Sequence, residues 1–261
     1  MSEYLYLSDL KLVWFFNFGV LFLRYLFFAG LAYLFIWKIF KSKLIHRRIQ
    51  ENFPTSEKIR SEIYYSFSTL FIFSIVGTFV FFLKTKGYTL IYSNFSEHGI
   101  GYFLFTVFFA ILFHDFYFYI THRLMHHKLI FKYVHKVHHN STDPSPWAAF
   151  AFHPIEAVIE AGIVPILIFI IPIHPLAIFF FLVYMTFMNV LGHLGFELFP
   201  KNSVIHPILK WSNTTTHHNM HHKYFNSNFG LYFNIWDRVF KTNHEKYIEN
   251  FQKVTNSISK N

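Results

Sequence analysis

Long blocks of apolar residues with very few charges constrain the fold of this chain more than any other feature. Three blocks, at residues 12–39, 64–83 and 101–120, each reach the ~20 residues that a helix needs to cross the hydrocarbon core of a bilayer. We therefore expect an integral membrane protein. Arg24, in the middle of the first block, is expected to face protein or the interface, because a lone charge in hydrocarbon is costly.

Two further apolar blocks, at residues 155–171 and 175–191, are joined by the sequence Pro-Ile-His-Pro. Proline removes a backbone donor and ends a helix, so this sequence is typical of a turn between two helices. We expect a helical hairpin that enters the membrane. The expected fold class is all-α, with four to five apolar transmembrane or hairpin helices and a histidine-rich helical cap on the cytoplasmic side.

The net charge of +9 is distributed over short loops between the apolar blocks, and residues 38–60 form the most basic loop. Basic loops of a membrane protein lie on the cytoplasmic side, so this loop is placed there and nucleic acid is not an expected partner. Residues 122–153 and the segment after His193 then fall on the same side. Lys84 and Lys86 on the opposite side count against this orientation. The chain has no cysteine, which excludes disulfides, thiolate ligands and iron–sulfur clusters.

The histidines carry the strongest functional signal, because many of the 18 recur at helical spacing. An HxxxH pair is followed by two HxxHH groups, and a single histidine follows the last apolar block. Side chains three and four residues apart share one face of a helix, so each group can direct its rings to one place. The candidate metal ligands are His122, His126, His135, His138, His139, His193, His218, His221 and His222.

This number of ligands exceeds the four positions of a structural zinc and indicates two ions with open coordination positions. Imidazole alone does not select among iron, copper, zinc and nickel. A divalent-metal transporter or sensor is the main alternative, but transport sites lie near the membrane midplane, whereas these histidines flank the spans. A bis-histidine haem carrier would explain only one pair of them.

Several stretches resemble the fatty acid hydroxylase/sterol desaturase superfamily over about residues 101–247. The resemblance is carried by Asp115-Phe-Tyr-Phe-Tyr-Ile-Thr-His122-Arg-Leu-Met-His126, His135-Lys-Val-His-His-Asn-Ser, His218-Asn-Met-His-His, Asn228-Phe-Gly and Trp236-Asp-Arg-Val-Phe-Lys-Thr. The resemblance implies a membrane-bound non-haem enzyme in which the nine histidines hold two iron ions. Lys241 departs from the family, which often has glycine at this position. His217 leaves the register of the third group ambiguous, and His218 is preferred because it repeats the HxxHH spacing.

The same resemblance implies a reaction in which dioxygen and an external electron donor hydroxylate or desaturate a C–H bond of a lipid, such as a fatty acyl chain or a sterol. Both reactions begin with removal of a hydrogen atom, and hydroxylation is favoured narrowly. No haem domain accompanies the motifs, so a separate donor is expected, such as cytochrome b5 or a ferredoxin with its reductase.

Acidic residues near the histidines are candidates to orient the ligands, because a ligating imidazole usually donates its second N–H to a carboxylate or carbonyl. Asp115, Glu156, Glu197 and Asp237 lie close to the motifs in sequence. Asp115 is the preferred candidate, with a pairing to Arg123 as its alternative. Whether His114, His153 or His217 join the site is left open. Residues 1–100 are expected to form N-terminal membrane helices, 101–247 the hydroxylase-like domain and 248–261 a polar tail.

Overall fold

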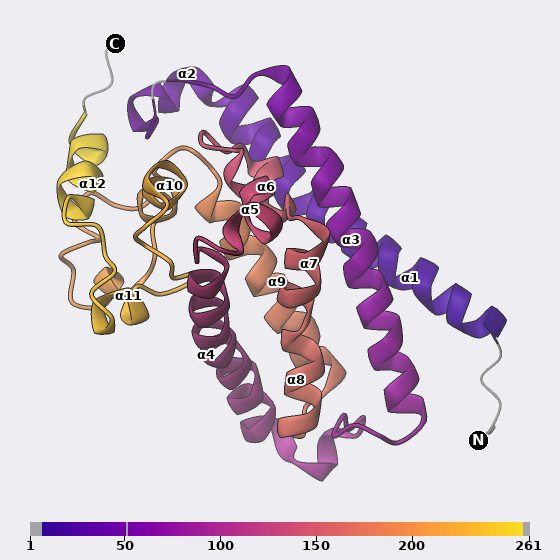
Figure 1. Ribbon diagram of the computed structural model, residues 1–261. Coiled ribbons are helices and arrows are strands. Elements are labelled where there is room, and N and C mark those ends of the chain that lie inside the picture. The colour runs from indigo at the N-terminus through magenta and orange to yellow at the C-terminus, as the bar shows by residue number, and fades with distance from the viewer. Residues whose placement is uncertain (1–6, 51, 258–261) are drawn as a thin grey trace.

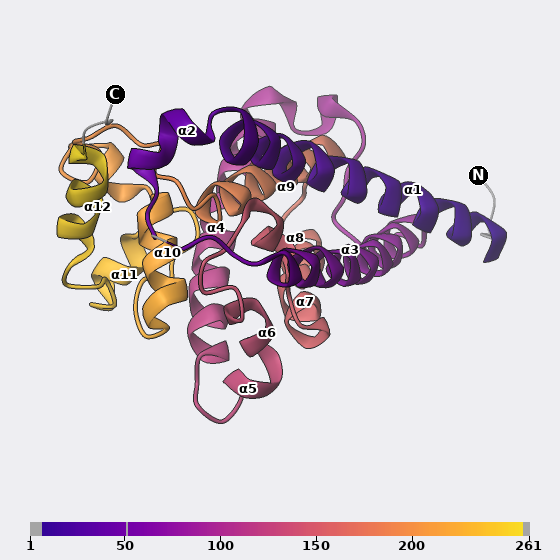
Figure 2. The same ribbon diagram turned by 90° about the horizontal axis from the view of Figure 1, so that it is seen from above.

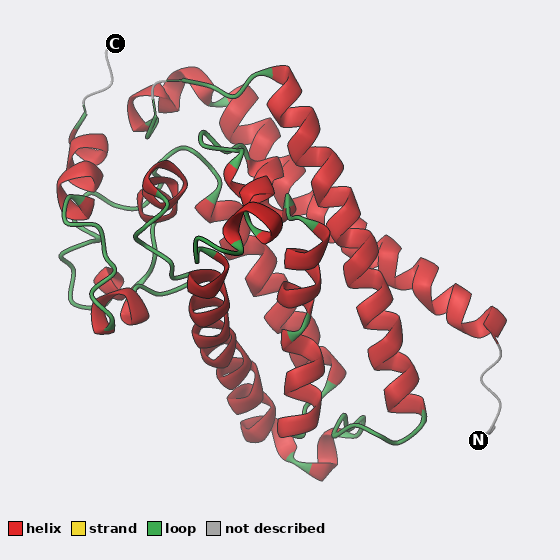
Figure 3. Cartoon of the chain, viewed as in Figure 1, coloured by secondary structure: helices red, strands yellow, loops and turns green. Residues whose placement is uncertain are grey.

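The computed structural model describes residues 7–50 and 52–257 as an assembly of helices (Figure 1). Within these residues the chain forms no strand, and only three isolated β-bridges occur (Figure 3). The α-helices are α1 (Leu7–Tyr25), α2 (Lys41–Leu44), α3 (Ser56–Thr85), α4 (Gly99–Met125), α5 (Phe131–Val134), α6 (Lys136–His139), α7 (Pro154–Ala161), α8 (Ile163–Ile170), α9 (Pro175–Gly192), α10 (Thr215–Tyr224), α11 (Ile235–Val239) and α12 (Tyr247–Asn256).

Four helical stretches are long and apolar enough to cross a membrane, and they confirm the all-α membrane fold. They are Asp9–Ile39, in which α1 continues into the π-helical segments Leu26–Gly30 and Tyr33–Ile39, and the helices α3, α4 and α9. Helix α3 begins at Ser56 rather than at residue 64, because the Thr55 side chain accepts a hydrogen bond from the amide of Lys58 and caps a polar first turn.

The expected hairpin has a first arm made of two short helices, which corrects the expectation of one continuous helix. Helices α7 and α8 meet at Gly162, three residues before Pro165. Proline at this position cannot donate to the carbonyl of Ala161, and its ring crowds that carbonyl, so the helical run breaks here. The second arm is α9, which begins with Pro175 and is capped by the His174 side chain.

The long helices pack around one apolar core. Helix α1 crosses α3 obliquely, α8 and α9 pack against this pair, and α4 packs against α8 and α9 (Figure 1). Tyr25, Leu70, Phe150 and Phe181 are fully buried where these helices meet. Many phenylalanines on the outer faces are exposed, including Phe105 and Phe108 of α4. These exposed rings suit a surface that contacts hydrocarbon rather than water.

The short helices form a cap at one end of the bundle, where α4 and α9 end and α3 begins. Figure 2 shows α10, α11 and α12 together, at the opposite end of the molecule from the N-terminal half of α1. Trp37 Nε1 donates to the carbonyl of Leu194 at 2.8 Å, so the end of the first span holds the loop that follows α9. Of residues 248–261, which were expected to form a polar tail, 248–256 belong to α12, whose Phe251 is buried in the cap, and 258–261 lie outside the described residues.

Candidate metal centre

The structure brings the side chains of all nine predicted histidines together at the junction of the cap and the bundle. They form two groups, and within each group the ligand nitrogens lie within 4.8 Å of one another. The five-histidine group consists of His122, His126, His135, His139 and His221. The four-histidine group consists of His138, His193, His218 and His222.

Each HxxHH motif contributes to both groups, because its side chains at offsets of three and four residues diverge slightly around the helix. In the first motif His135 and His139 join the five-histidine group and His138 joins the other. The motif of α10 is divided in the opposite way, with only His221 in the five-histidine group. The two groups are therefore adjacent sites that share the same pair of helical segments.

Backbone carbonyls fix the ring orientation of three ligands. A carbonyl oxygen can only accept a hydrogen bond, so the facing Nδ1 must carry the proton and Nε2 must present its lone pair inward. The bonds run from His122 Nδ1 to Phe229 O at 2.8 Å, from His193 Nδ1 to Asn189 O at 2.7 Å, and from His221 Nδ1 to Ser227 O at 2.7 Å.

The carboxyl group of Glu156 fixes the ring orientation of a fourth ligand, His135. The His135 Nδ1–H donates to Glu156 Oε1 at 2.7 Å, and both side chains are almost completely buried. Glu156 lies in the first turn of α7, where His153 caps the helix and Pro154 begins it. The carboxylate that orients a ligand is thus Glu156, which the sequence offered only as one of four nearby acids.

The spacing of the inward nitrogens fits a metal ion. His122 Nε2 and His135 Nε2 lie 3.0 Å apart, and His193 Nε2 and His218 Nε2 lie 3.1 Å apart. Because the protons of His122 and His135 are used at Nδ1, no proton is left to bridge their Nε2 atoms, and facing lone pairs repel. Two nitrogens ~2.1 Å from one ion and at right angles would lie about 3.0 Å apart. The donor set therefore fits a transition metal in each group.

Burial keeps these imidazoles in the neutral form that binds metal. Desolvation, with a smaller contribution from neighbouring His122, lowers the pKa of His126 to about 2. Desolvation also lowers the pKa of His193 to about 4. Desolvation is also the main reason why the pKa values of six other ligands lie well below the ordinary value. These ligands are His135, His138, His139, His218, His221 and His222.

The loop that supplies the Phe229 carbonyl is held by Asp237. Its carboxylate accepts from the amide of Phe229 at 2.9 Å and from the amide of Gly230 at 2.8 Å. A Cβ atom on Gly230 would lie 2.4 Å from the carbonyl oxygen of Phe233, so only glycine fits there. The Asn-Phe-Gly and Trp-Asp motifs, far from His122 in sequence, thus form one support for it.

Asp115 supports the same loop rather than a histidine of either group. Its Oδ1 accepts from the amides of Tyr232 and Phe233 at 2.8 and 3.2 Å. Among the described residues it pairs neither with a candidate ligand nor with Arg123, whose guanidinium donates to the Tyr119 hydroxyl. Both sequence-based interpretations of Asp115 are replaced by a role in holding the loop.

The three histidines left open by the sequence lie outside both groups. His114 Nδ1 is 2.7 Å from the Tyr232 hydroxyl, and His153 caps α7. His217 Nε2 donates to Asn243 Oδ1 at 3.1 Å. The structure thus places His218, and not His217, among the candidate ligands.

Comparison with known proteins agrees with this geometry. The family model for fatty acid hydroxylase matches residues 107–242, just over half of the 261 residues. The chain is 33% identical over 226 residues to Delta(7)-sterol 5(6)-desaturase ERG3B of Gibberella zeae, covering 84% of this chain and 65% of that protein. It is 29% identical over 220 residues to human lathosterol oxidase, covering 84% of this chain and 70% of the relative. It is 32% identical over 235 residues to the Delta(7)-sterol 5(6)-desaturase erg3A of Aspergillus fumigatus, covering 90% and 61%.

The chain thus spans roughly two thirds of the length of these relatives, namely 65%, 70% and 61%. No solved structure matches. The matched region contains all nine histidines as well as Glu156 and Asp237. This chain belongs to the fatty acid hydroxylase/sterol desaturase superfamily.

Proposed function

We propose that this protein is a membrane-bound oxidoreductase that holds two non-haem iron ions and uses dioxygen to oxidise a C–H bond of a sterol-like lipid. The observation that carries this proposal is the convergence of nine imidazoles, eight of them buried, into adjacent groups of five and four. An all-nitrogen, neutral donor set suits iron. Five and four ligands leave open positions around each ion if it is six-coordinate.

The protein's own residues hold and orient this centre. Glu156 and the carbonyls of Phe229, Asn189 and Ser227 fix the tautomers of four ligands. The surrounding cap and core keep water from these imidazoles, except for that of the partly buried His126. Bound iron would supply the activation of dioxygen that is needed to remove a hydrogen atom from an unactivated carbon, for which no amino-acid side chain is strong enough.

The substrate class is inferred from the relatives. Their names describe desaturation of a Delta(7)-sterol and oxidation of lathosterol. We therefore favour desaturation of a ring lipid over the hydroxylation that the motifs alone favoured narrowly. Fatty acyl lipids remain the second candidate for the substrate. Hydroxylation remains the second candidate for the reaction, because hydroxylation and desaturation begin with the same hydrogen abstraction.

The electron donor is proposed to be a separate acidic protein that docks on the cap from the cytoplasm, such as cytochrome b5 or a ferredoxin with its reductase. Lys128, Lys132 and Lys136 lie exposed beside the segment that carries His126 and His135. A basic surface near a redox centre favours approach of an acidic partner.

A transport role fits the geometry less well. Transport sites lie near the midplane between discontinuous helices, so that an ion can be released on either side. Here the candidate ligands lie where the spans end, and eight of the nine are buried. This arrangement favours a resident ion.

The direct test is anaerobic purification in lipid, followed by metal analysis and by mass spectrometry of a supplied Delta(7)-sterol after addition of dioxygen and a reducing system. We expect about two irons per chain and a product that has lost two hydrogens. A mass gain of one oxygen would move the assignment to hydroxylation. Stoichiometric zinc together with unreacted lipids would overturn the proposal.

A further inference from the structure

Helix α11 packs against the last turns of α4, close to where this span leaves the hydrocarbon of the membrane. The ring centroids of Trp236 and Phe116 lie 4.8 Å apart, and Phe240 stacks on Tyr119 at 5.4 Å. A helix crosses the ~30 Å hydrocarbon core in about 20 residues, so a core entered at Gly99 ends near residue 119. Helix α11 therefore lies at the level of the lipid headgroups.

The 3-10 helix Leu209–Trp211 is joined to the start of α11 by hydrogen bonds. The backbone amide of Asn234 donates to the carbonyl of Trp211 at 3.0 Å, and the side-chain amide of Asn234 donates to the carbonyl of Lys210 at 2.9 Å. Arg238 Nη2 donates to the same Lys210 carbonyl at 3.2 Å. The two segments thus form one unit beside the end of α4.

This unit exposes large apolar side chains. Ile208 is 75% exposed, Val239 is 62% exposed and Trp211 is 42% exposed. Exposed apolar patches mark interaction sites, including membrane contacts, and tryptophan is enriched where a membrane meets water. We call these three residues, together with Lys210 and Arg238, the interfacial patch. Its position beside a span indicates that this patch contacts lipid.

Two cations of the interfacial patch lie next to the ring of Trp211. Lys210 Nζ is 5.3 Å and Arg238 Cζ is 5.2 Å from the ring centroid. Among the residues that the structure describes, neither cation forms an ion pair with a carboxylate. The neighbouring Asp237 is fully buried and accepts hydrogen bonds from backbone amides instead. Two neighbouring positive charges without a counterion favour the binding of an anion.

The guanidinium of Arg238 has donors to offer to such an anion. Of its five N–H groups, one at Nε donates to Asn234 Oδ1 at 2.7 Å and one at Nη2 donates to the carbonyl of Lys210 at 3.2 Å. The other N–H groups have no hydrogen-bond partner within the described part of the chain, and the side chain is exposed. A guanidinium fits the oxygens of a phosphate group particularly well.

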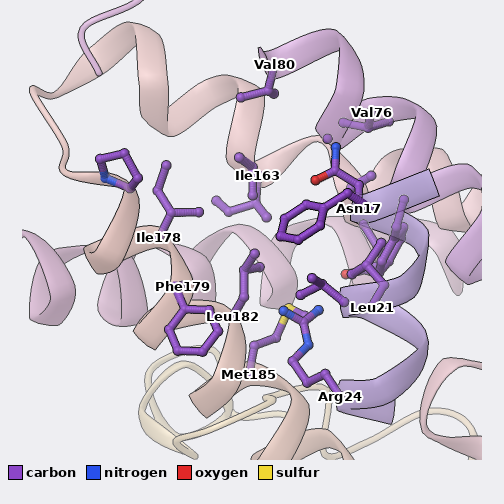
Figure 4. A pocket seen from close by; sticks show the side chains of 18 residues that line it. Asn17, Leu21, Arg24, Val76, Val80, Ile163, Ile178, Phe179, Leu182 and Met185 are labelled. Carbon is purple, nitrogen blue, oxygen red and sulfur yellow. The ribbon is translucent and has the colours of Figure 1, made fainter. Parts of the chain in front are cut away.

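Arg24 of the first span is in the opposite situation. It lines a cavity of about 390 Å³ inside the bundle, where it lies beside Met185 (Figure 4). The lining of this cavity is almost entirely aliphatic and aromatic. Arg24 thus faces protein, whereas Arg238 lies on the outside of the cap, where a lipid headgroup can reach it.

We propose that the interfacial patch binds an anionic phospholipid of the surrounding membrane. The phosphate accepts hydrogen bonds from Arg238, the negative charge is attracted by Lys210, and the glycerol and upper acyl carbons lie against Trp211. A zwitterionic phospholipid fits less well, because its own cationic group repels Lys210. Anionic lipids are concentrated in the cytoplasmic leaflet, which is the side on which the cap is proposed to lie. This inference does not depend on the proposed redox function.

The test measures lipid binding to the purified full-length chain in detergent by native mass spectrometry. Phosphatidylglycerol and phosphatidylcholine with identical acyl chains are compared. We expect phosphatidylglycerol to bind at least about fivefold more tightly, which is the factor expected from one cation near a membrane surface. Equal affinity for the two lipids would overturn the inference. Displacement of the lipid by an equal concentration of glycerol 3-phosphate would also contradict it, because it would indicate a site for a soluble phosphate ester.

Variants locate the site. Lys210→Gln removes a charge whose side chain makes no hydrogen bond within the described residues, and it should weaken phosphatidylglycerol binding by about fivefold. Arg238→Gln should have a larger effect, because it also removes donors to the phosphate, and Arg238→Lys should restore part of the affinity. Lys253→Gln, at an exposed position of α12, is the matched control and should leave binding unchanged.

Two results with these variants would contradict the assignment. One is unchanged phosphatidylglycerol binding in both Lys210→Gln and Arg238→Gln. The other is unchanged lipid binding combined with slower reduction of the protein by an acidic electron donor, which would assign the interfacial patch to a protein partner.

Discussion

The five-histidine and four-histidine groups share two helical motifs but differ in their surroundings. In the five-histidine group His126 is only partly buried and lines a surface hollow with His127 and Phe225. Every member of the four-histidine group is buried, and His138 lies against Phe152 of the core. The two proposed ions would therefore differ: one is held by more ligands close to the surface, and the other by fewer ligands facing the interior.

This difference predicts unequal tolerance to the loss of one ligand. His193→Ala should leave three imidazoles in the four-histidine group, so we expect this group to lose its ion. The rate of lipid oxidation should fall by at least about a hundredfold. This loss is larger than the ~10–100-fold that is typical when a residue behind a ligand is changed. His126→Ala is the matched change at the five-histidine group and should retain more iron, because four ligands remain. Iron analysis and product formation measure both effects. Equal iron loss in the two variants would show that the groups are equivalent.

Acid should destabilise the metal-free protein through these groups. The folded pKa values of about 2 for His126 and about 4 for His193 lie below the ordinary 6.5, so below pH 6.5 the unfolded chain takes up protons that the folded chain does not. The free energy of unfolding should then fall by ~1.4 kcal/mol per pH unit for each such histidine. We expect a lower thermal midpoint at pH 5.5 than at pH 7.5.

A pair of variants tests whether the buried imidazoles cause this dependence of the thermal midpoint on pH. His138→Gln removes one buried titrating group and should reduce the fall in the thermal midpoint. His206→Gln changes an exposed histidine and should not alter it. An identical fall in His138→Gln and wild type would argue against the buried imidazoles as its source.

Loss of the carboxylate behind His135 should have an intermediate effect. Glu156→Gln keeps the shape of the side chain but replaces the carboxyl group that holds the Nδ1–H of His135 with an amide, which is a weaker acceptor. We expect iron affinity of the five-histidine group to drop by ~10–100-fold, measured by competition with a chelator. Glu245→Gln, at an exposed position, serves as the control. Unchanged iron affinity in Glu156→Gln would show that the 2.7 Å contact has no influence on the ion.

The smallest effect is expected at Lys241, in the turn that follows α11. Its φ of +56° lies in the left-handed region, which costs a non-glycine residue roughly 1 kcal/mol. Lys241→Gly should raise the thermal midpoint by a few degrees and leave the iron content unchanged. A lower midpoint would mean that the lysine side chain stabilises this turn by more than the backbone strain costs.

Features set by local spacing could be predicted from the sequence. The apolar blocks gave the four spans, and the three-and-four spacing of His135, His138 and His139 indicated that their rings converge. The division of each motif between two groups could not be predicted, because it depends on how α6 faces α10. Glu156 and the carbonyl of Phe229 reach their ligands across 21 and 107 residues, so their roles follow only from tertiary packing. The preference for Asp115 failed for the same reason.

The most direct test of the two-ion centre is anomalous diffraction at the iron edge from crystals of the anaerobically purified protein. Our account predicts two peaks, one inside each histidine group, each ~2.1 Å from the surrounding Nε2 atoms. A single peak, or peaks outside these two groups, would contradict it.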